Sequence, residues 1–339
     1  MSVNLFETRE LTQQVNQLYP IGNFLTNTFF KNVKNPESEH IDVTIKKGKR
    51  RLAPFVSPKV GGKVVTSLGK TVATYKPAYI KDKRIFDVDT ALSAQNVFYA
   101  DKLSPQQRLA TRITEDLADQ VDMIARRVEY MAVQALTTGT VSIVGDGIDE
   151  VVDFGMDSDH LVTLTGTALW SNSASDPRAN LKTWRTLMQK DSGISPNIMI
   201  GDITAIDAYV NHAKVKDTLD SRRIDMGMIN PTILPGGVTY YGFDRELGLD
   251  IYSYVEWYFD EETGEDVSLM PAGKIILGSD KAQTVLAHGM IKDLKALYAT
   301  KYFTKSWEEE DPSVRYLLTQ SAPLTIPTQI DAFMCNKVV

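Results

Sequence analysis

The hydrophobic pattern is most regular between residues 105 and 138, where apolar side chains recur along one helical face. Ser104 is placed to cap this helix, Pro105 suits its first position, and Gly139 follows its end. Such a helix would run roughly 50 Å, which favours a brace for an extended molecule over a coiled coil, since no heptad repeat continues. The stripe consists of Ile113, Leu117, Val121, Ile124, Val128, Met131 and Ala135.

The pattern before this helix is different. Residues 1–50 contain few apolar positions, so this segment is expected to be an arm that packs on another surface. Residues 53–86 are rich in Val, Thr and Tyr and are interrupted by glycines, which predicts a long β-hairpin with a basic, weakly apolar tip.

The pattern after the helix alternates between strands and helices. Residues 141–155 predict a hairpin that turns at Gly145-Asp146-Gly147. A second helix should begin at Asp176-Pro177 and end near Gly193, and a third should span about 203–219, with Ala213 on its inner face. Short strands follow, including an acidic hairpin tip at 260–266, and the chain is expected to end in strands.

Composition limits the classes of protein that fit. The chain has 339 residues, 43% of them hydrophobic, which is enough for about two domains with buried cores. Cys335 is the single cysteine, so no internal disulfide can form. No apolar run is long enough to span a membrane and the first residues do not form a secretory signal, so we expect a cytoplasmic site of synthesis without a membrane partner.

The charge is unevenly distributed along the chain. Residues 1–83 contain 14 Lys and Arg against 6 Asp and Glu, a net of +8, whereas residues 84–339 contain 23 against 37, a net of −14. A basic run at 46–51 dominates the first part. This asymmetry indicates an acidic partner, which is either the body of another subunit or nucleic acid.

Motifs for catalysis or cofactor binding are incomplete in this sequence. Gly69-Lys70-Thr71 ends like a phosphate-binding loop, but the glycine required five residues earlier is replaced by Val64. The four histidines are far apart, and a solvated loop accounts for residues 157–160 better than a metal site does. We therefore expect no catalytic residue, no cofactor and no bound metal.

Several stretches, taken in chain order, match one known pattern. They are Val56-Ser57-Pro58 with VGGKVVTSLG after it, KPAYIKDK at 76–83, VVDFGMDSD at 151–159, Leu219-Asp220-Ser221-Arg222-Arg223, Trp307, Asp311-Pro312 and LLTQSAPLTIPTQIDAF at 317–333. Together they resemble the major capsid proteins of lambda-type siphophages, the capsid protein E family.

The resemblance implies the Hong Kong 97-type capsid fold, an α+β fold with an arm, an extended loop, a peripheral domain and an axial domain. On this sequence the expected divisions are an N-terminal arm at 1–50, an extended β-hairpin loop at 51–88, a peripheral domain at 89–155 and 290–339 that contains the spine helix 105–138, and an axial domain at 156–289.

The resemblance also implies a function and partners. Copies of such a protein form pentamers and hexamers that close into an icosahedral shell around phage DNA, in the virion, after assembly in the host bacterial cytoplasm. A separate scaffolding protein, a portal and, for some members, a decoration protein take part, and DNA is contacted non-specifically if at all. The basic run at 46–51 is not part of the family pattern, and a fused scaffold is not expected because no long coiled segment precedes the arm.

The expected subunit interface combines the basic arm and loop with the end of the third helix. If residues 1–50 lie on the next copy, a chain without them should stay folded but fail to assemble. Two alternatives remain open, an encapsulin-like nanocompartment shell and a soluble α+β enzyme with an unrecognised site. The expected interface residues are Lys46, Lys47, Lys49, Arg50, Arg51, Lys59, Lys63, Lys70, Asp220, Arg222 and Arg223.

Overall fold

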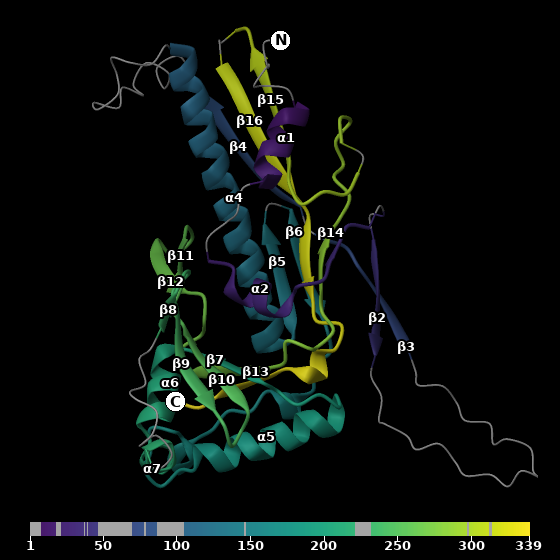
Figure 1. Cartoon of the computed structure of the whole chain (residues 1–339). Coiled ribbons are helices and arrows are strands. Elements are labelled where there is room, and N and C mark those ends of the chain that lie inside the picture. Colours follow the sequence, from purple (N-terminus) through teal and green to yellow (C-terminus); the bar gives the residue numbers. More distant parts are fainter. Residues whose placement is uncertain are drawn as a thin grey trace, which may run out of the picture.

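The computed structural model arranges the chain as an elongated body built along one long helix (Figure 1). The structure describes residues 8–17, 22–36, 38, 40–46, 70–77, 79–86, 105–145, 147–220, 232–296, 298–311 and 314–339.

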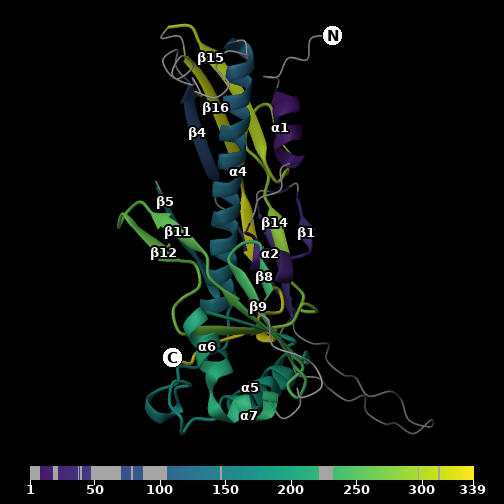
Figure 2. The ribbon, with the colours of Figure 1, turned by 60° about the vertical axis from the view of Figure 1, so that its left-hand side comes forward.

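The predicted long helix is confirmed as α4 (Pro105–Thr138), which is 34 residues long. All seven side chains of the predicted stripe are buried. The two views show α4 extending along most of the body, with strands and shorter helices packed along its length (Figures 1 and 2). The helix is therefore the brace that its apolar pattern indicates.

An antiparallel sheet covers the first half of α4. Its strands lie in the order β15 (Phe303–Glu309), β16 (Val314–Ser321) and β4 (Ile80–Phe86). Helix α1 (Thr8–Gln17) lies on the same side of this sheet as α4, because Leu11 and Val15 share a buried cluster with Leu117 and Leu317. Asp116 in α4 forms an ion pair with Arg84 of β4 at 2.7 Å.

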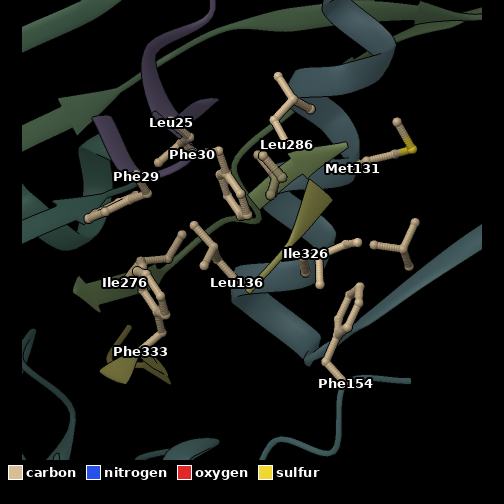
Figure 3. Packing of buried hydrophobic residues seen from close by; sticks show 14 of the residues in the cluster. Leu25, Phe29, Phe30, Met131, Leu136, Phe154, Ile276, Leu286, Ile326 and Phe333 are labelled. Atoms are coloured by element: carbon tan, nitrogen blue, oxygen red, sulfur yellow. The ribbon is translucent and has the colours of Figure 1, made fainter. Parts of the chain in front are cut away.

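The second half of α4 contacts a larger core, part of which Figure 3 shows. Helix α2 (Phe24–Phe29) packs against it, beside a small sheet of β1 (Val33–Lys34), β14 (Val285–His288) and β17 (Pro323–Ile326). The hairpin of β5 (Thr140–Gly145) and β6 (Ile148–Asp153) follows α4 directly, as predicted.

A six-stranded mixed sheet forms the other end of the molecule, with the strand order β18-β13-β7-β10-β9-β8. Helices α5, α6 and α7 pack on the face that points away from α4 (Figure 1). The strands are β7 (Ile198–Gly201), β8 (Thr232–Leu234), β9 (Val238–Asp244), β10 (Leu249–Tyr254), β13 (Lys274–Gly278) and β18 (Met334–Lys337). The helices are α5 (Pro177–Asp191), α6 (Ile203–Asn211), α7 (Ala213–Asp220) and the 3-10 turns η1 (Ser158–His160), η2 (Gly166–Ala168) and η3 (Ile330–Ala332).

Two further hairpins complete the fold. The acidic one is confirmed, with β11 (Trp257–Asp260) paired to β12 (Glu265–Ser268). The other joins β2 (Ile41–Lys46) to β3 (Lys70–Tyr75), so its first strand lies inside the range expected to be arm. The alternation of Ile41, Val43 and Ile45 is the signal for this strand. The predicted domain limits themselves remain predictions.

The expectation that residues 1–50 lie away from their own subunit is wrong for helices α1 and α2 and for Phe30. Leu11, Val15, Leu25, Phe29 and Phe30 are all buried in the subunit's own clusters. The apolar positions are few, but they occur four residues apart on short helices, and each pair fits against α4 and its sheets. Removing residues 1–50 would therefore open the core, and such a chain is not expected to stay folded.

The third predicted helix is divided at His212, whose backbone is extended with φ −64° and ψ 132°. Because α7 begins after this break, Ala213 is exposed rather than inward as predicted. The second helix agrees with its prediction, since the Asp176 carboxylate caps α5 by accepting a 3.0 Å hydrogen bond from the Ala179 N–H.

One buried carboxylate connects the N-terminal segment to the rest of the molecule. Glu129 of α4 accepts hydrogen bonds from the backbone N–H groups of Leu25 (2.6 Å) and Thr26 (3.0 Å), and from the Thr26 hydroxyl (2.6 Å). The Tyr254 hydroxyl of β10 donates to it at 3.3 Å. Burial raises the pKa of Glu129, and the bonds from Thr26 and Leu25 oppose that shift.

The buried stripe predicts that Leu117→Asp destabilises the subunit itself. Leu117 is buried in an apolar cluster, so the substitution buries a charge without a partner and should lower the free energy of unfolding by about 4 kcal/mol or more. Urea unfolding measures this. Met123→Asp on the exposed side of α4 is the control, and equal stabilities of the two variants would contradict the assignment of the faces.

The Glu129 contacts predict that Glu129→Ala is more damaging than Glu129→Gln. Alanine leaves the Leu25 and Thr26 N–H groups buried without acceptors, which should cost about 3 kcal/mol, whereas glutamine keeps one acceptor oxygen.

Because the pKa of Glu129 is higher in the folded state, protonation of Glu129 stabilises the folded protein. This stabilisation is complete below pH 4.5, the ordinary pKa, and is lost as the pH rises through the raised folded-state pKa. The wild-type advantage over Glu129→Gln in urea unfolding should therefore shrink with rising pH. A pH-independent difference would contradict this.

Candidate assembly surfaces

The structure tests the position of only some of the expected interface residues. Lys46 and Lys70 form a cross-strand pair at the end of β2 and β3 farthest from the body. Asp220 is the last residue of α7. The other expected residues, Lys47, Lys49, Arg50, Arg51, Lys59, Lys63, Arg222 and Arg223, lie outside the described residues.

The β2–β3 hairpin is anchored at its base and leaves the body toward its end (Figure 1). Ile41 and Tyr75 are a buried cross-strand pair, and the Tyr75 ring lies 5.5 Å from the ring of Phe154. The Thr74 hydroxyl donates a 2.6 Å hydrogen bond to Asp42 across the strands. The far ends of β2 and β3 are thus held away from the core by a fixed base.

The β11–β12 hairpin lies on the opposite side of α4 (Figure 1). It contacts the helix through Tyr258, whose ring is 5.2 Å from that of Tyr130. The alternate side chains Trp257 and Phe259 face solvent, with 52% and 63% of their surface exposed. All six residues at 261–266 are exposed, so this hairpin presents aromatic surface and an acidic tip together.

The β5–β6 hairpin has a second exposed apolar face. Val144 and Val151 are 66% and 63% exposed, whereas Val141 and Val152 on the other face are buried. The sequence predicts the hairpin from its alternation and its glycine turn, but local pattern cannot say which face the rest of the chain covers.

Among the described residues, α1 and α4 cover one face of the sheet β15-β16-β4. On the other face the rings of Trp307 and Tyr316 stack with centroids 5.2 Å apart, and the Lys83 ammonium lies 3.9 Å from the Tyr316 centroid. Ile85 is exposed beside them. Exposed apolar groups of this size, at three places on the molecule, are typical of surfaces that contact other proteins.

The residues considered for catalysis or metal binding are part of the regular structure of the fold. Lys70 and Thr71 belong to strand β3, so no helix follows the loop-like triplet. His160 is buried in η1, with its ring nitrogens 2.8 Å from the Phe333 carbonyl oxygen and 3.4 Å from the Asp191 carboxylate. No three His, Cys, Asp or Glu side chains within the described ranges are placed to hold a metal ion. Among the same residues, no helix is long and apolar enough to cross a membrane.

Comparisons with known proteins agree on one family. The model of the family described as phage major capsid protein E matches residues 7–338. The major capsid protein of Enterobacteria phage P21 is 27% identical over 99% of this chain and 100% of its own length, and that of Escherichia phage lambda is 25% identical over 98% of each. A solved capsid protein of an Escherichia coli CFT073 prophage superposes with a TM-score of 0.71 at 20% identity, over 98% of this chain and 99% of that one.

The alternation along β11 predicts opposite behaviour for neighbouring residues. The double variant Trp257→Ser, Phe259→Ser should keep the wild-type free energy of unfolding within about 0.5 kcal/mol, because both side chains face solvent, and should reduce self-association. Tyr258→Ser, the matched control, should lower stability because it removes the contact with Tyr130. Urea unfolding and light scattering measure the two effects. Unchanged self-association of the double variant would exclude this face as an interface.

Proposed function

The chain belongs to the phage major capsid protein E family, and from this premise we propose that its copies assemble as pentamers and hexamers into an icosahedral shell that encloses phage DNA. The observation that carries the proposal is the family match over residues 7–338, which includes every described helix and strand. The proposed place of the protein is the head shell of the virion, after assembly in the host bacterial cytoplasm.

The positions of the two hairpins support a head-to-tail contact between subunits. The described strands β2 and β3 reach Lys46 and Lys70 on one side of α4, and the acidic tip at 261–266 lies on the other side. A contact between two different surfaces of identical subunits is heterologous, and such contacts close into rings when the rotation allows it. Pentamers and hexamers are rings of this kind.

The uneven charge supports the same arrangement. With +8 on residues 1–83 and −14 on residues 84–339, each copy offers a basic surface and an acidic one. A single exposed ion pair contributes at most about 1 kcal/mol, but the same pairs recur at every interface of a closed shell. Salt should weaken them, since the Debye length falls to roughly 3 Å at 1 M. The predicted interface residues Asp220, Arg222 and Arg223 remain part of this proposal.

Further partners belong to the proposal as well. A separate scaffolding protein and a portal would guide assembly, a decoration protein would bind the outside, and DNA would be contacted non-specifically. We also infer that the protein has no catalytic turnover of its own, since the family is one of shell proteins.

The encapsulin-like shell is the second candidate, because it shares the fold. Electron microscopy of particles purified from infected or expressing cells tests both, since closed particles with nuclease-protected DNA support the capsid and particles filled with enzyme support the alternative. If the protein stays monomeric under all assembly conditions and shows substrate-specific turnover that one substitution abolishes, the enzyme is favoured instead.

The opposite charges of the two hairpins predict a rescue experiment. Glu261→Lys with Glu262→Lys reverses charge at the exposed acidic tip and should reduce the yield of closed particles several-fold without loss of subunit stability. Adding Lys46→Glu and Lys70→Glu to the same chain should restore part of the yield, most clearly at low salt. Sedimentation of assembly reactions measures the yield. If the fourfold variant assembles no better than either pair alone, the two hairpins do not meet.

A further inference from the structure

Three side chains form an apolar row across the sheet β15-β16-β4, on the face that points away from α4. Trp307, Tyr316 and Ile85 are direct cross-strand partners, and side chains that lie directly opposite one another project from the same face. Leu317 and Phe86, which alternate with them along their strands, belong to the cluster beneath α4. Ile85 is 58% exposed, so the row reaches the surface of the subunit.

The next rows of the same face are basic. Lys305 and Lys83 lie at its two edges, and Lys81 is exposed one row further along β4. Lys305 is paired with Asp293, whereas Lys81 and Lys83 form no ion pair with a described residue. On the other side of the apolar row, Glu309 accepts the hydrogen bond of a tyrosine hydroxyl. The face therefore combines apolar surface with two lysines that lack a carboxylate partner among the described residues.

The β5–β6 hairpin has an exposed face of the opposite charge. Val144 lies opposite Asp149 and shares its face with Val151 and Asp153, and all four side chains are exposed. The two valines thus lie between two carboxylates. Every charged side chain in the described strands of this hairpin is an acid, so its outer face is both apolar and negative.

We propose that the β5–β6 hairpin of a second copy covers the face of β4, β15 and β16, with its valines on the apolar row and Asp149 beside Lys81 and Lys83. Contact between the apolar groups removes both surfaces from water, and the opposite charges select this pairing. Either surface paired with itself would place lysines against lysines or carboxylates against carboxylates, which is unfavourable. The contact joins two different surfaces and is therefore heterologous.

The inference rests on the proposed function in one respect, that copies of the chain associate. The β11–β12 hairpin also offers apolar and acidic groups, but its tip is the proposed partner of Lys46 and Lys70. The β5–β6 hairpin and the sheet face are the remaining exposed apolar surfaces described above, and they are complementary in charge.

Cysteine cross-linking between two variants tests the contact. One variant is Val151→Cys and the other is Ile85→Cys, and one of them carries a tag that changes its mobility in a gel. The native thiol of Cys335 is buried, so oxidised wild-type protein gives the background. After mixing under assembly conditions and oxidation, the mixed disulfide dimer should exceed the dimers of either variant alone at least about tenfold, because a disulfide requires Cα atoms within about 7 Å.

The matched control for this pair is Phe259→Cys mixed with Ile85→Cys, because Phe259 is exposed on the other hairpin. A mixed dimer of the control pair at an equal or higher yield would assign the sheet face to β11–β12 and overturn the proposal. If Ile85→Cys does not fold, Lys83→Cys replaces it, since that side chain is exposed in the adjacent row.

Charge reversal gives an independent readout of the same contact. Lys81→Glu with Lys83→Glu places carboxylates against Asp149 and should lower the yield of the mixed dimer several-fold, most clearly at low salt. Asp149→Lys in the other variant should restore part of the yield. Lys190→Glu, at the exposed end of α5, should leave the yield unchanged. An equal yield with and without the lysine reversal would overturn the proposed pairing.

The same preparations separate this inference from the proposed function. If closed particles form and the mixed dimer stays at background, the pairing of the two faces is wrong and shell assembly stands. If wild-type copies do not associate under any condition, the proposed function is wrong and this contact is excluded with it. A mixed dimer without closed particles supports the contact and contradicts the shell.

Discussion

The burial of one continuous stripe on α4 is the contact on which the rest of the structure depends. Four residues of the stripe, from Ile113 to Ile124, belong to the cluster beneath the sheet β15-β16-β4. Residues of its second half, from Val128 to Leu136, belong to the main core. One helix thus joins two apolar clusters that would otherwise be separate, and at about 25 cal/mol per Å² of buried apolar surface this contact outweighs any single polar interaction in the fold.

The six-stranded sheet extends this arrangement to the third cluster. Along β7, Ile198 and Ile200 face the main core whereas Met199 faces the helices α5 and α6. Because successive side chains of a strand point to opposite faces, one sheet can lie between two cores and contribute residues to both. A buried network fixes the helical side, where Arg178 and the Tyr209 hydroxyl both donate to the carboxylate of Asp244 at 2.9–3.1 Å. Burial and that carboxylate raise the pKa of Tyr209, so its hydroxyl stays a donor.

Surfaces that the subunit does not cover follow from the same geometry. Each projecting hairpin buries one face on the body and leaves the other in water, so Trp257 with Phe259, and Val144 with Val151, are exposed as a direct result of strand alternation. A subunit that works alone would gain nothing from such faces, whereas a shell subunit can bury them against its neighbours. The buried Glu129 has the complementary role of holding the N-terminal segment on its own subunit while those surfaces remain available.

The sequence by itself determined the long helix, its buried stripe, the hairpin at 140–153, the start of α5 and the acidic tip, because each depends on periodicity or end signals among neighbouring residues. The family resemblance in ordered stretches was also readable from it, and the family match agrees. Only the tertiary structure decided that Leu11, Leu25 and Phe29 pack inside their own subunit and that β4 pairs with β16 rather than with a hairpin partner. The physical reason is that burial and strand pairing join residues that are up to hundreds of positions apart. The local pattern of apolar residues indicates which face of a segment is buried, but not which other part of the chain covers that face.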